Sequence, residues 1–237
     1  MKNLNSVFLA LFMVVFSISA ASAKTIESFI KEYKVKSFTS INANTIADIV
    51  YTQCENTIVK AQGSQEMIDH LKVTVDKGVL TITNDKEHNN QVAEPLTVYI
   101  SSPSIESIET HGKGNCSLAG KVKADNLKIH SEGMGHVEAL RLETNKICVN
   151  YDGFGDLNLA GTTDIVEITS NGVGNIDAQN LVSKTAMVKS TKLGKVECFA
   201  TDCVGIFNEG IGDITYHGNP KMTNLQNEGM GKIKEGV

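Results

Sequence analysis

The chain has 237 residues and carries 22 Lys and Arg against 27 Asp and Glu, which gives a formal net charge of −5 at pH 7. Proteins that bind nucleic acid gather Lys and Arg on one surface, whereas this chain has a single arginine, Arg141, and no basic run. Trp is absent and aromatic residues make up 5% of the chain, which argues against a site that stacks sugars on flat rings. We therefore expect no nucleic-acid partner.

The first 23 residues have the three parts of a secretory signal peptide. Lys2 supplies the positive charge, the run from Val7 to Ile18 is apolar, and Ala21-Ser22-Ala23 offers a cleavage site before Lys24. No cysteine stands at the cleavage point, which argues against a lipoprotein, and no second apolar run is long enough to span a membrane. The sequence thus predicts that residues 1–23 are removed and that the protein is exported to the periplasm, the cell surface or the medium.

Residues 24–104 predict a β region without a regular repeat. Asp76-Lys77-Gly78 is typical of a hairpin turn, Gln65 to His70 predicts a short helical turn, and the polar stretch from Asp85 to Glu94 predicts a loop that Pro95 closes. Because the open end of a stacked β-structure invites aggregation, we expect this region to cap the repeat array that follows. Alternating apolar residues predict strands at 38–41, 46–53, 57–61, 71–75, 79–83 and 96–100.

Residues 105–237 repeat the pattern polar-Gly-apolar-Gly-polar-apolar, as in Glu132-Gly133-Met134-Gly135-His136-Val137. The second glycines of successive copies are 18 to 21 residues apart, which is a period typical of solenoid proteins. Apolar residues alternate before and after each turn, and this indicates two strands per repeat. Because each such unit buries its apolar face only against its neighbours, the sequence predicts an all-β fold, a flattened two-sheet β-helix with coils of about 20 residues.

The glycines form a row at one edge of this predicted β-helix. Strand alternation turns both glycines of each pair inward, to a corner where the two sheets converge and a Cβ would collide. Glycine also permits the positive φ that a sharp corner often needs. The predicted structural turn glycines are Gly112, Gly114, Gly133, Gly135, Gly153, Gly155, Gly172, Gly174, Gly194, Gly210, Gly212, Gly229 and Gly231.

An apolar residue stands between the two glycines of five of these turns, and Leu193 takes the same place before Gly194 in a degenerate copy. Strict alternation turns these side chains outward, where they would form a continuous stripe, and such patches usually mark an interface. The glycines could instead switch the alternation and turn the same side chains into the core, so two placements are open. The residues are Met134, Phe154, Val173, Leu193, Ile211 and Met230.

All five cysteines follow the predicted signal peptide, and their spacing fits no metal template. Cys116 and Cys198 fall on inward positions and are expected to pack as small apolar residues, whereas Cys148 falls on an outward position. A disulfide between Cys198 and Cys203 is an open alternative, because exported proteins can form disulfides. The fifth cysteine is Cys54.

The chain resembles a known family over residues 35 to 235. The resemblance rests on the exported leader, the opening Phe38-Thr39-Ser40-Ile41, the later Gly78-Val79-Leu80-Thr81-Ile82 and the ladder of Gly-x-Gly turns. In these features the chain is similar to the auto-transporter adhesin head GIN domain family of Bacteroidetes-type bacteria. The resemblance implies a right-handed superhelix of two sheets like that of pectin lyases, without a recognised catalytic site, and a role in adhesion. The family often has Ser between the two glycines, where this chain has apolar residues.

A polysaccharide-active enzyme is the second function that a β-helix allows. Such enzymes place converging carboxylates on Ca²⁺, and the candidates beside the turns are Glu132, Asp152, Asp156, Glu209, Asp213 and Glu228. The row after the second glycine mixes charges, as a solvated face does: Asn115, His136, Asp156, Asn175, Lys195, Asp213 and Lys232.

An acid–base pair of His136 and Asp156 is the alternative within that row. Because the carboxylates are dispersed among residues of other charge, we expect no catalytic, metal or cofactor site. The leading interpretation is a non-enzymatic exported scaffold that binds a protein, a surface glycan or a second copy of itself.

Overall fold

The computed structural model describes residues 28–85, 94–191 and 193–236, and within these it contains seventeen strands and one short helix. The predicted signal peptide and most of the predicted loop at 85–94 lie outside the described residues. The expected strands and helical turn of the N-terminal region are confirmed, and β1 is an additional strand. The elements are β1 (Phe29–Tyr33), β2 (Ser40–Asn44), β3 (Asp48–Gln53), β4 (Ile58–Gly63), α2 (Gln65–Asp69), β5 (Leu71–Asp76), β6 (Val79–Asn84), β7 (Leu96–Ser102), β8 (Ser107–Thr110), β9 (Cys116–Leu118), β10 (Val122–Ser131), β11 (Val137–Tyr151), β12 (Leu157–Ser170), β13 (Ile176–Ser190), β14 (Val196–Asn208), β15 (Ile214–His217), β16 (Lys221–Asn227) and β17 (Ile233–Glu235).

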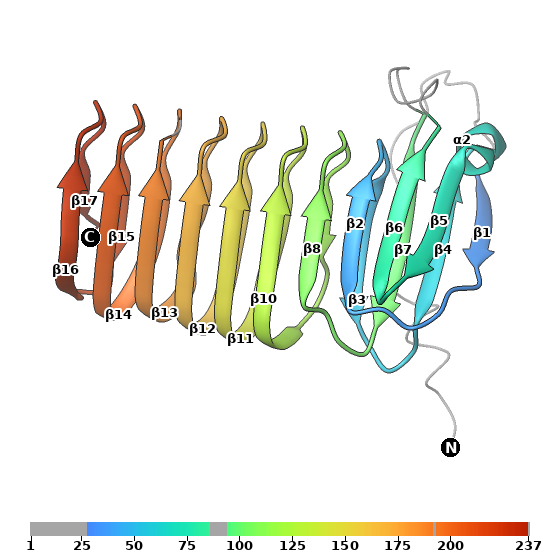
Figure 1. The fold of residues 1–237 in the computed structure, drawn as a ribbon, viewed down its shortest axis with the longest axis horizontal. Helices are drawn as coiled ribbons and strands as arrows, with labels where there is room; N and C mark the ends of the chain where they lie inside the picture. Colours follow the sequence, from blue (N-terminus) through green and yellow to red (C-terminus); the bar gives the residue numbers. More distant parts are fainter. Residues whose placement is uncertain (1–27, 86–93, 192, 237) are drawn as a thin grey trace, which may run out of the picture.

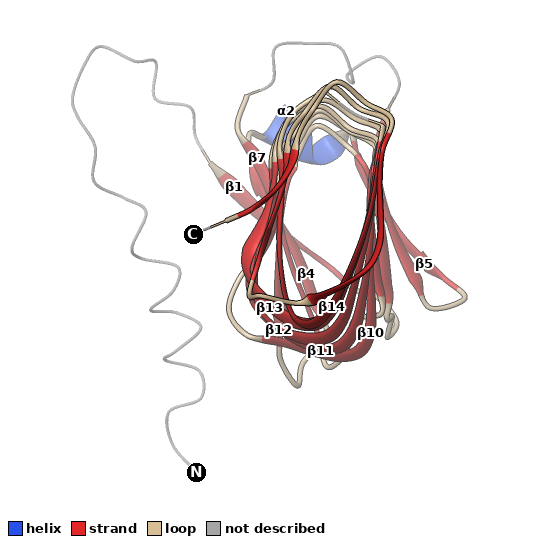
Figure 2. Cartoon of the chain, turned by 90° about the vertical axis from the view of Figure 1, so that its left-hand side faces the viewer, coloured by secondary structure: helices blue, strands red, loops and turns tan. Residues whose placement is uncertain are grey.

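The strands stack in parallel into the two walls of a flattened β-solenoid, which Figure 1 shows from the side and Figure 2 along the stack. In one wall β6, β2, β8 and β10 are hydrogen-bonded neighbours, and in the other β7, β3, β9 and the start of β11. Each of the long strands β11 to β14 begins in the second wall, bends at one edge of the solenoid and ends in the first. The predicted all-β solenoid of stacked coils is therefore confirmed.

The N-terminal region differs from the expected cap, because it also builds two coils of the solenoid. β2 pairs with β6 through Ser40 and Val79 and with β8 through Ser40 and Ser107, and β3 pairs with both β7 and β9. The coil of β2 and β3 thus lies between a coil that follows it in sequence, β6 and β7, and the first coil after residue 105. The end of the solenoid is covered by α2, β1, β4 and β5. Among these, the three strands add antiparallel pairs: β1 with β4, β4 with β7, and β5 with β6.

The core is the space between the two walls, and it is filled by the inward side chains of each strand. Leu127, Ile129 and Ile147 are among the largest fully buried side chains, as alternation predicts. Cys116 and Cys198 are buried as expected, and burial raises the pKa of each thiol to about 12. All five cysteines are free, so the alternative of a disulfide at Cys198 is not found.

The turn glycines are required for a reason that differs from the predicted one. A Cβ on Gly174 would stand 1.7 Å from the carbonyl oxygen of Gly155, and one on Gly212 would stand 1.6 Å from that of Gly194. The obstacle is therefore the backbone of the same turn one coil earlier, and not the convergence of the two walls. Gly174 also has a φ of +130°, which L-residues with a side chain rarely adopt.

Candidate binding surface

The apolar residues between the paired glycines point into solvent along one edge of the solenoid. The exposed fraction is 58% for Phe154 and for Ile211 and 39% for Val173, the least exposed of the six. Parallel bridges join Met134 to Phe154, Phe154 to Val173 and Val173 to Leu193, so the alternation of the strands continues through the turn. We call this row the apolar ridge: Met134, Phe154, Val173, Leu193, Ile211 and Met230.

Backbone hydrogen bonds between coils hold the ridge in register. The Met134 N–H donates to the Gly112 carbonyl at 2.8 Å, and the Phe154 N–H donates to the Gly133 carbonyl at 2.9 Å. From the core side, the Tyr151 hydroxyl donates to the Gly155 carbonyl at 2.5 Å. The ridge therefore presents its side chains from a fixed backbone.

The row after the second glycine forms a hydrogen-bonded ladder along one flank of the ridge. In each rung a side chain accepts the backbone N–H of the residue one coil later: Asp48 accepts from Asn115 at 2.8 Å, and Asn115 from His136 at 2.9 Å. His136 accepts from Asp156 through Nδ1 at 3.1 Å, with the Asp156 carboxylate 3.8 Å away. The Asp, Asn and His members of this row thus serve as acceptors, and His136 with Asp156 is one rung of the ladder. Lys195 and Lys232 carry no side-chain acceptor, so their side chains do not continue it.

The predicted carboxylates on the other flank do not converge on one point. Asp152 accepts a hydrogen bond from Asn171 Nδ2 at 2.6 Å, and Asn171 accepts one from Thr191 Oγ1 at 2.7 Å. Glu132 instead meets two histidines, His111 and His130. This contact was not identified from the sequence. The signal that indicates it is the spacing of 21 residues between His111 and Glu132, which is one coil of the repeat.

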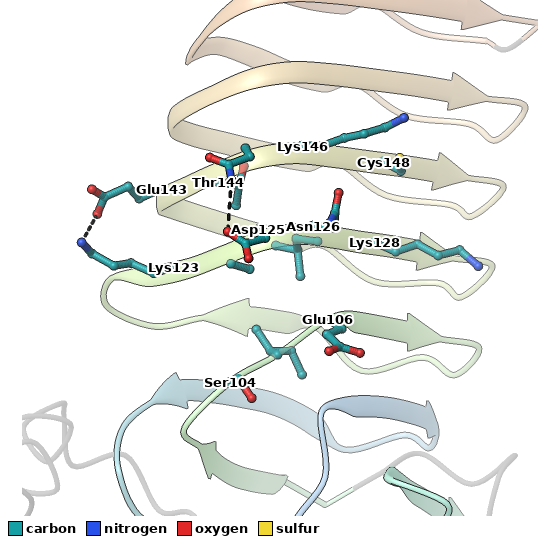
Figure 3. A pocket seen from close by; sticks show the side chains of 14 residues that line it. Ser104, Glu106, Lys123, Asp125, Asn126, Lys128, Glu143, Thr144, Lys146 and Cys148 are labelled. Atoms are coloured by element: carbon teal, nitrogen blue, oxygen red, sulfur yellow. Dashed lines mark hydrogen bonds and ion pairs between the residues drawn. The ribbon is translucent and has the colours of Figure 1, made fainter.

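A polar groove of about 870 Å³ lies farther from the ridge, on the side where the long strands bend (Figure 3). Two of its carboxylates already have partners within the groove: Lys123 Nζ lies 3.0 Å from a Glu143 oxygen, and Asn145 donates to Asp125 at 3.1 Å. Hydrogen bonds from Lys121 and Lys123 lower the pKa of the Glu143 carboxyl. None of the described residues that line the groove is aromatic, and they are Ser104, Ile105, Glu106, Lys123, Ala124, Asp125, Asn126, Leu127, Lys128, Glu143, Thr144, Asn145, Lys146 and Cys148.

No helix in the described ranges has the length and apolar character that crossing a membrane requires.

The chain's fold is shared with solved structures. A crystal structure of a putative adhesin from Bacteroides fragilis NCTC 9343 is 32% identical in sequence, with a TM-score of 0.83, and the match covers 88% of this chain and 97% of that chain.

More distant structures share the fold alone. A putative lipid binding protein from Parabacteroides distasonis ATCC 8503 is 18% identical, with a TM-score of 0.66, over 90% of this chain and 98% of that one. A putative adhesin from Parabacteroides merdae ATCC 43184 is also 18% identical, with a TM-score of 0.65, over 90% and 98% of the two chains. No curated protein matches the chain significantly.

The sequence also matches a family model directly. The model is described as "Putative auto-transporter adhesin, head GIN domain", and it matches residues 37–220. This range contains the inserted coil of β2 and β3 and most of the Gly-x-Gly turns. The chain therefore belongs to the auto-transporter adhesin head GIN domain family.

Proposed function

We propose that this protein is an exported, non-enzymatic adhesion scaffold that binds its partner through the apolar ridge. The observation that carries the proposal is the ridge itself, in which apolar side chains are exposed on six consecutive turns of a fixed backbone. Soluble proteins rarely keep a contiguous apolar surface without a use for it. Membership of an adhesin family and the signal peptide predicted at residues 1–23 support export and adhesion.

The chemistry of the ridge favours a protein surface as the partner. Its side chains are aliphatic or thioether groups with one phenyl ring, Phe154, and no Trp, whereas sugar-binding sites use broad flat rings. Six side chains spaced at about 4.8 Å make a ridge about 24 Å long. A strand, a helix or the same ridge of a second copy could cover this length. Met134 and Met230 at the two ends suit a contact that adapts in shape.

A polysaccharide-active enzyme remains the alternative, and the polar groove is where it would act. The groove contains Glu106, Asp125 and Glu143 together with lysines. Asp125 and Glu143 already bind Asn145 and Lys123, which leaves them poorly prepared to bind Ca²⁺ together. Incubation with uronate-containing glycans, with and without Ca²⁺, tests this alternative, and release of unsaturated products would favour it over the scaffold.

The ridge proposal is tested by replacing two of its side chains, with Phe154→Ser and Ile211→Ser in one chain. Both side chains are 58% exposed, so we expect the melting temperature to stay nearly unchanged. Self-association, measured by analytical ultracentrifugation, and attachment of protein-coated beads to cell layers should be lost. Leu140→Ser is the matched control, because Leu140 is 47% exposed but lies in the bend of β11, away from the ridge. A double variant that associates and attaches like the wild type would contradict the proposal.

A further inference from the structure

The cluster of His111, His130 and Glu132 is a feature that the adhesion proposal does not use. His111 follows the end of β8, and His130 and Glu132 lie at the end of β10. β8 and β10 are parallel neighbours in which Glu109 pairs with His130 and Thr110 with Ser131. Alternation turns His111, His130 and Glu132 to the outer face, and the register places them side by side.

The potential ligand atoms of the three side chains lie close together. His111 Nδ1 is 3.0 Å from Glu132 Oε2, and His130 Nε2 is 2.9 Å from Glu132 Oε1. All three ligand atoms lie within 4.8 Å of one another, and no other group of three His, Cys, Asp or Glu in the described ranges is this compact. Small rotations of the side chains would place an ion at about 2.0 to 2.2 Å from each atom.

We propose that His111, His130 and Glu132 bind a divalent transition-metal ion, and that Zn²⁺ is the best match. Two imidazole nitrogens and one carboxylate oxygen are a common ligand set for Zn²⁺, and they leave a fourth position open. Ca²⁺ and Mg²⁺ are poor matches, because they prefer a shell of oxygen atoms.

The surroundings of the cluster support a cation. The Glu109 carboxylate lies 4.0 Å from His111 Nε2, beyond hydrogen-bond distance, and a small approach would let it accept the proton of the nitrogen that faces away from the ion. Asn42 Nδ2 donates to Glu109 at 3.4 Å, and Lys128 Nζ lies 3.7 Å from its other oxygen.

The open coordination position faces free space. His130 Nδ1 is buried and has no hydrogen-bond partner among the described residues, so Nε2 is the nitrogen that can meet an ion. A cavity of about 200 Å³ is lined by His111, Glu132 and Met134, among others. A water molecule or a side chain of a partner can therefore reach the ion, and Met134 places the site at the first residue of the apolar ridge.

The test is a calorimetric titration of the metal-free protein, without a histidine tag, with ZnCl₂. We expect one site per chain. His130→Asn should lower the affinity by more than about 100-fold, because it removes one of three ligands. The fold accepts Asn at this place, since Asn150 occupies it in the next coil. Glu132→Gln should weaken binding in the same way, and it serves if His130→Asn lowers the melting temperature of the metal-free protein.

Two control variants separate this site from other side chains that bind Zn²⁺. His136→Asn removes an exposed histidine outside the cluster and keeps the acceptor that Asn115 and Asn175 supply in the same row. Cys148→Ser removes a half-buried thiol beside Glu167. Both controls should bind Zn²⁺ like the wild type. The proposal is overturned if His130→Asn and Glu132→Gln also bind like the wild type, or if the wild type binds Zn²⁺ more weakly than about 1 mM.

Discussion

The coil of β2 and β3 and the coils after residue 105 stack in one solenoid, but they close their turns differently. The turn Thr45-Ile46-Ala47 contains no glycine, and Thr45 Oγ1 closes it by accepting the Ala47 N–H at 3.0 Å and donating to Asn84 Oδ1. The next turn must contain glycine, because a Cβ on Gly112 would stand 1.7 Å from the Thr45 carbonyl oxygen.

The difference lies in what each turn is stacked on. The coil below Thr45-Ile46-Ala47 is that of β6 and β7. β6 ends at Asn84 and β7 begins at Leu96, so the connection between these two strands is much longer than the turn above it. From Gly112 onward each turn stacks on a similar turn at backbone distance. A Gly-x-Gly turn therefore indicates a tightly stacked turn beneath it, rather than a particularly sharp corner of its own.

The largest expected effect comes from adding a side chain where the turns stack. Gly174→Val would place Cβ 1.7 Å from the Gly155 oxygen, at a φ of +130°. We expect the free energy of unfolding, measured by urea denaturation, to fall by about 3 kcal/mol or more from steric overlap and backbone strain. An unchanged urea midpoint would show that the turns do not stack this closely.

Two further substitutions serve as controls for that prediction. Gly120→Ala meets no atom within 4 Å but has a φ of +85°, so it should cost only the strain of this conformation, about 1 to 2 kcal/mol. Ala47→Gly in the N-terminal turn should cost about 1 kcal/mol, from lost packing and greater freedom of the unfolded chain. A loss at Gly120 as large as that at Gly174 would mean that φ alone, and not stacking, explains the glycines.

A smaller effect is expected from breaking the ladder where the two regions meet. Asp48 of β3 accepts hydrogen bonds from the Asn115 backbone and side-chain nitrogens at 2.8 and 3.1 Å. Asp48→Ala should lower the free energy of unfolding by about 1 to 2 kcal/mol, whereas Asp48→Asn keeps an acceptor and should cost less. Asp156→Ala removes the single acceptor of the Asn175 N–H between two repeat coils. A much larger loss at Asp48 than at Asp156 would show that the ladder contributes more to stability at the junction than between repeat coils.

The smallest effect concerns acid. The pKa of the Asp213 carboxyl is lowered by hydrogen bonds from the Lys232 backbone and the Lys234 side chain, below its ordinary value of 3.8. A lowered folded pKa gives stability that is present above the ordinary pKa and is lost as the pH falls through the folded one. Asp213→Asn keeps an acceptor for Lys232 but has no charge to lose. Its melting temperature should therefore fall less than that of the wild type between neutral pH and about pH 2, and equal losses would contradict this assignment.

Much of the solenoid could be predicted because its signals are local. Alternation within each strand and the Gly-x-Gly period establish coil length, inward residues such as Ile129 and Cys198, and the stacking of repeats. The placement of the ridge stayed open, because glycines on both sides of Phe154 permit either orientation. The bridges between turns, which depend on atomic positions in neighbouring coils, leave Phe154 exposed.

Two other features depend on contacts that local patterns do not encode. The position of β2 between β6 and β8 joins Ser40 to Val79 and Ser107, and no repeat links these segments. The cluster of His111, His130 and Glu132 depends on the register of β8 against β10: the 21-residue spacing brings His111 beside Glu132, but it does not show that His130 contacts the same carboxylate.

The insertion of β2 and β3 also determines the order in which the chain can fold. The first coil in the sequence has neither of its neighbours until β6 and β7 have formed on one side and β8 and β9 on the other. A chain that emerges from its N-terminus thus keeps one edge of Ser40–Gln53 unpaired until residues up to Leu118 have followed. Because contacts between distant segments form slowly, folding of this protein should begin in the later repeats, which pair with the coils next to them in sequence, and close the N-terminal end last.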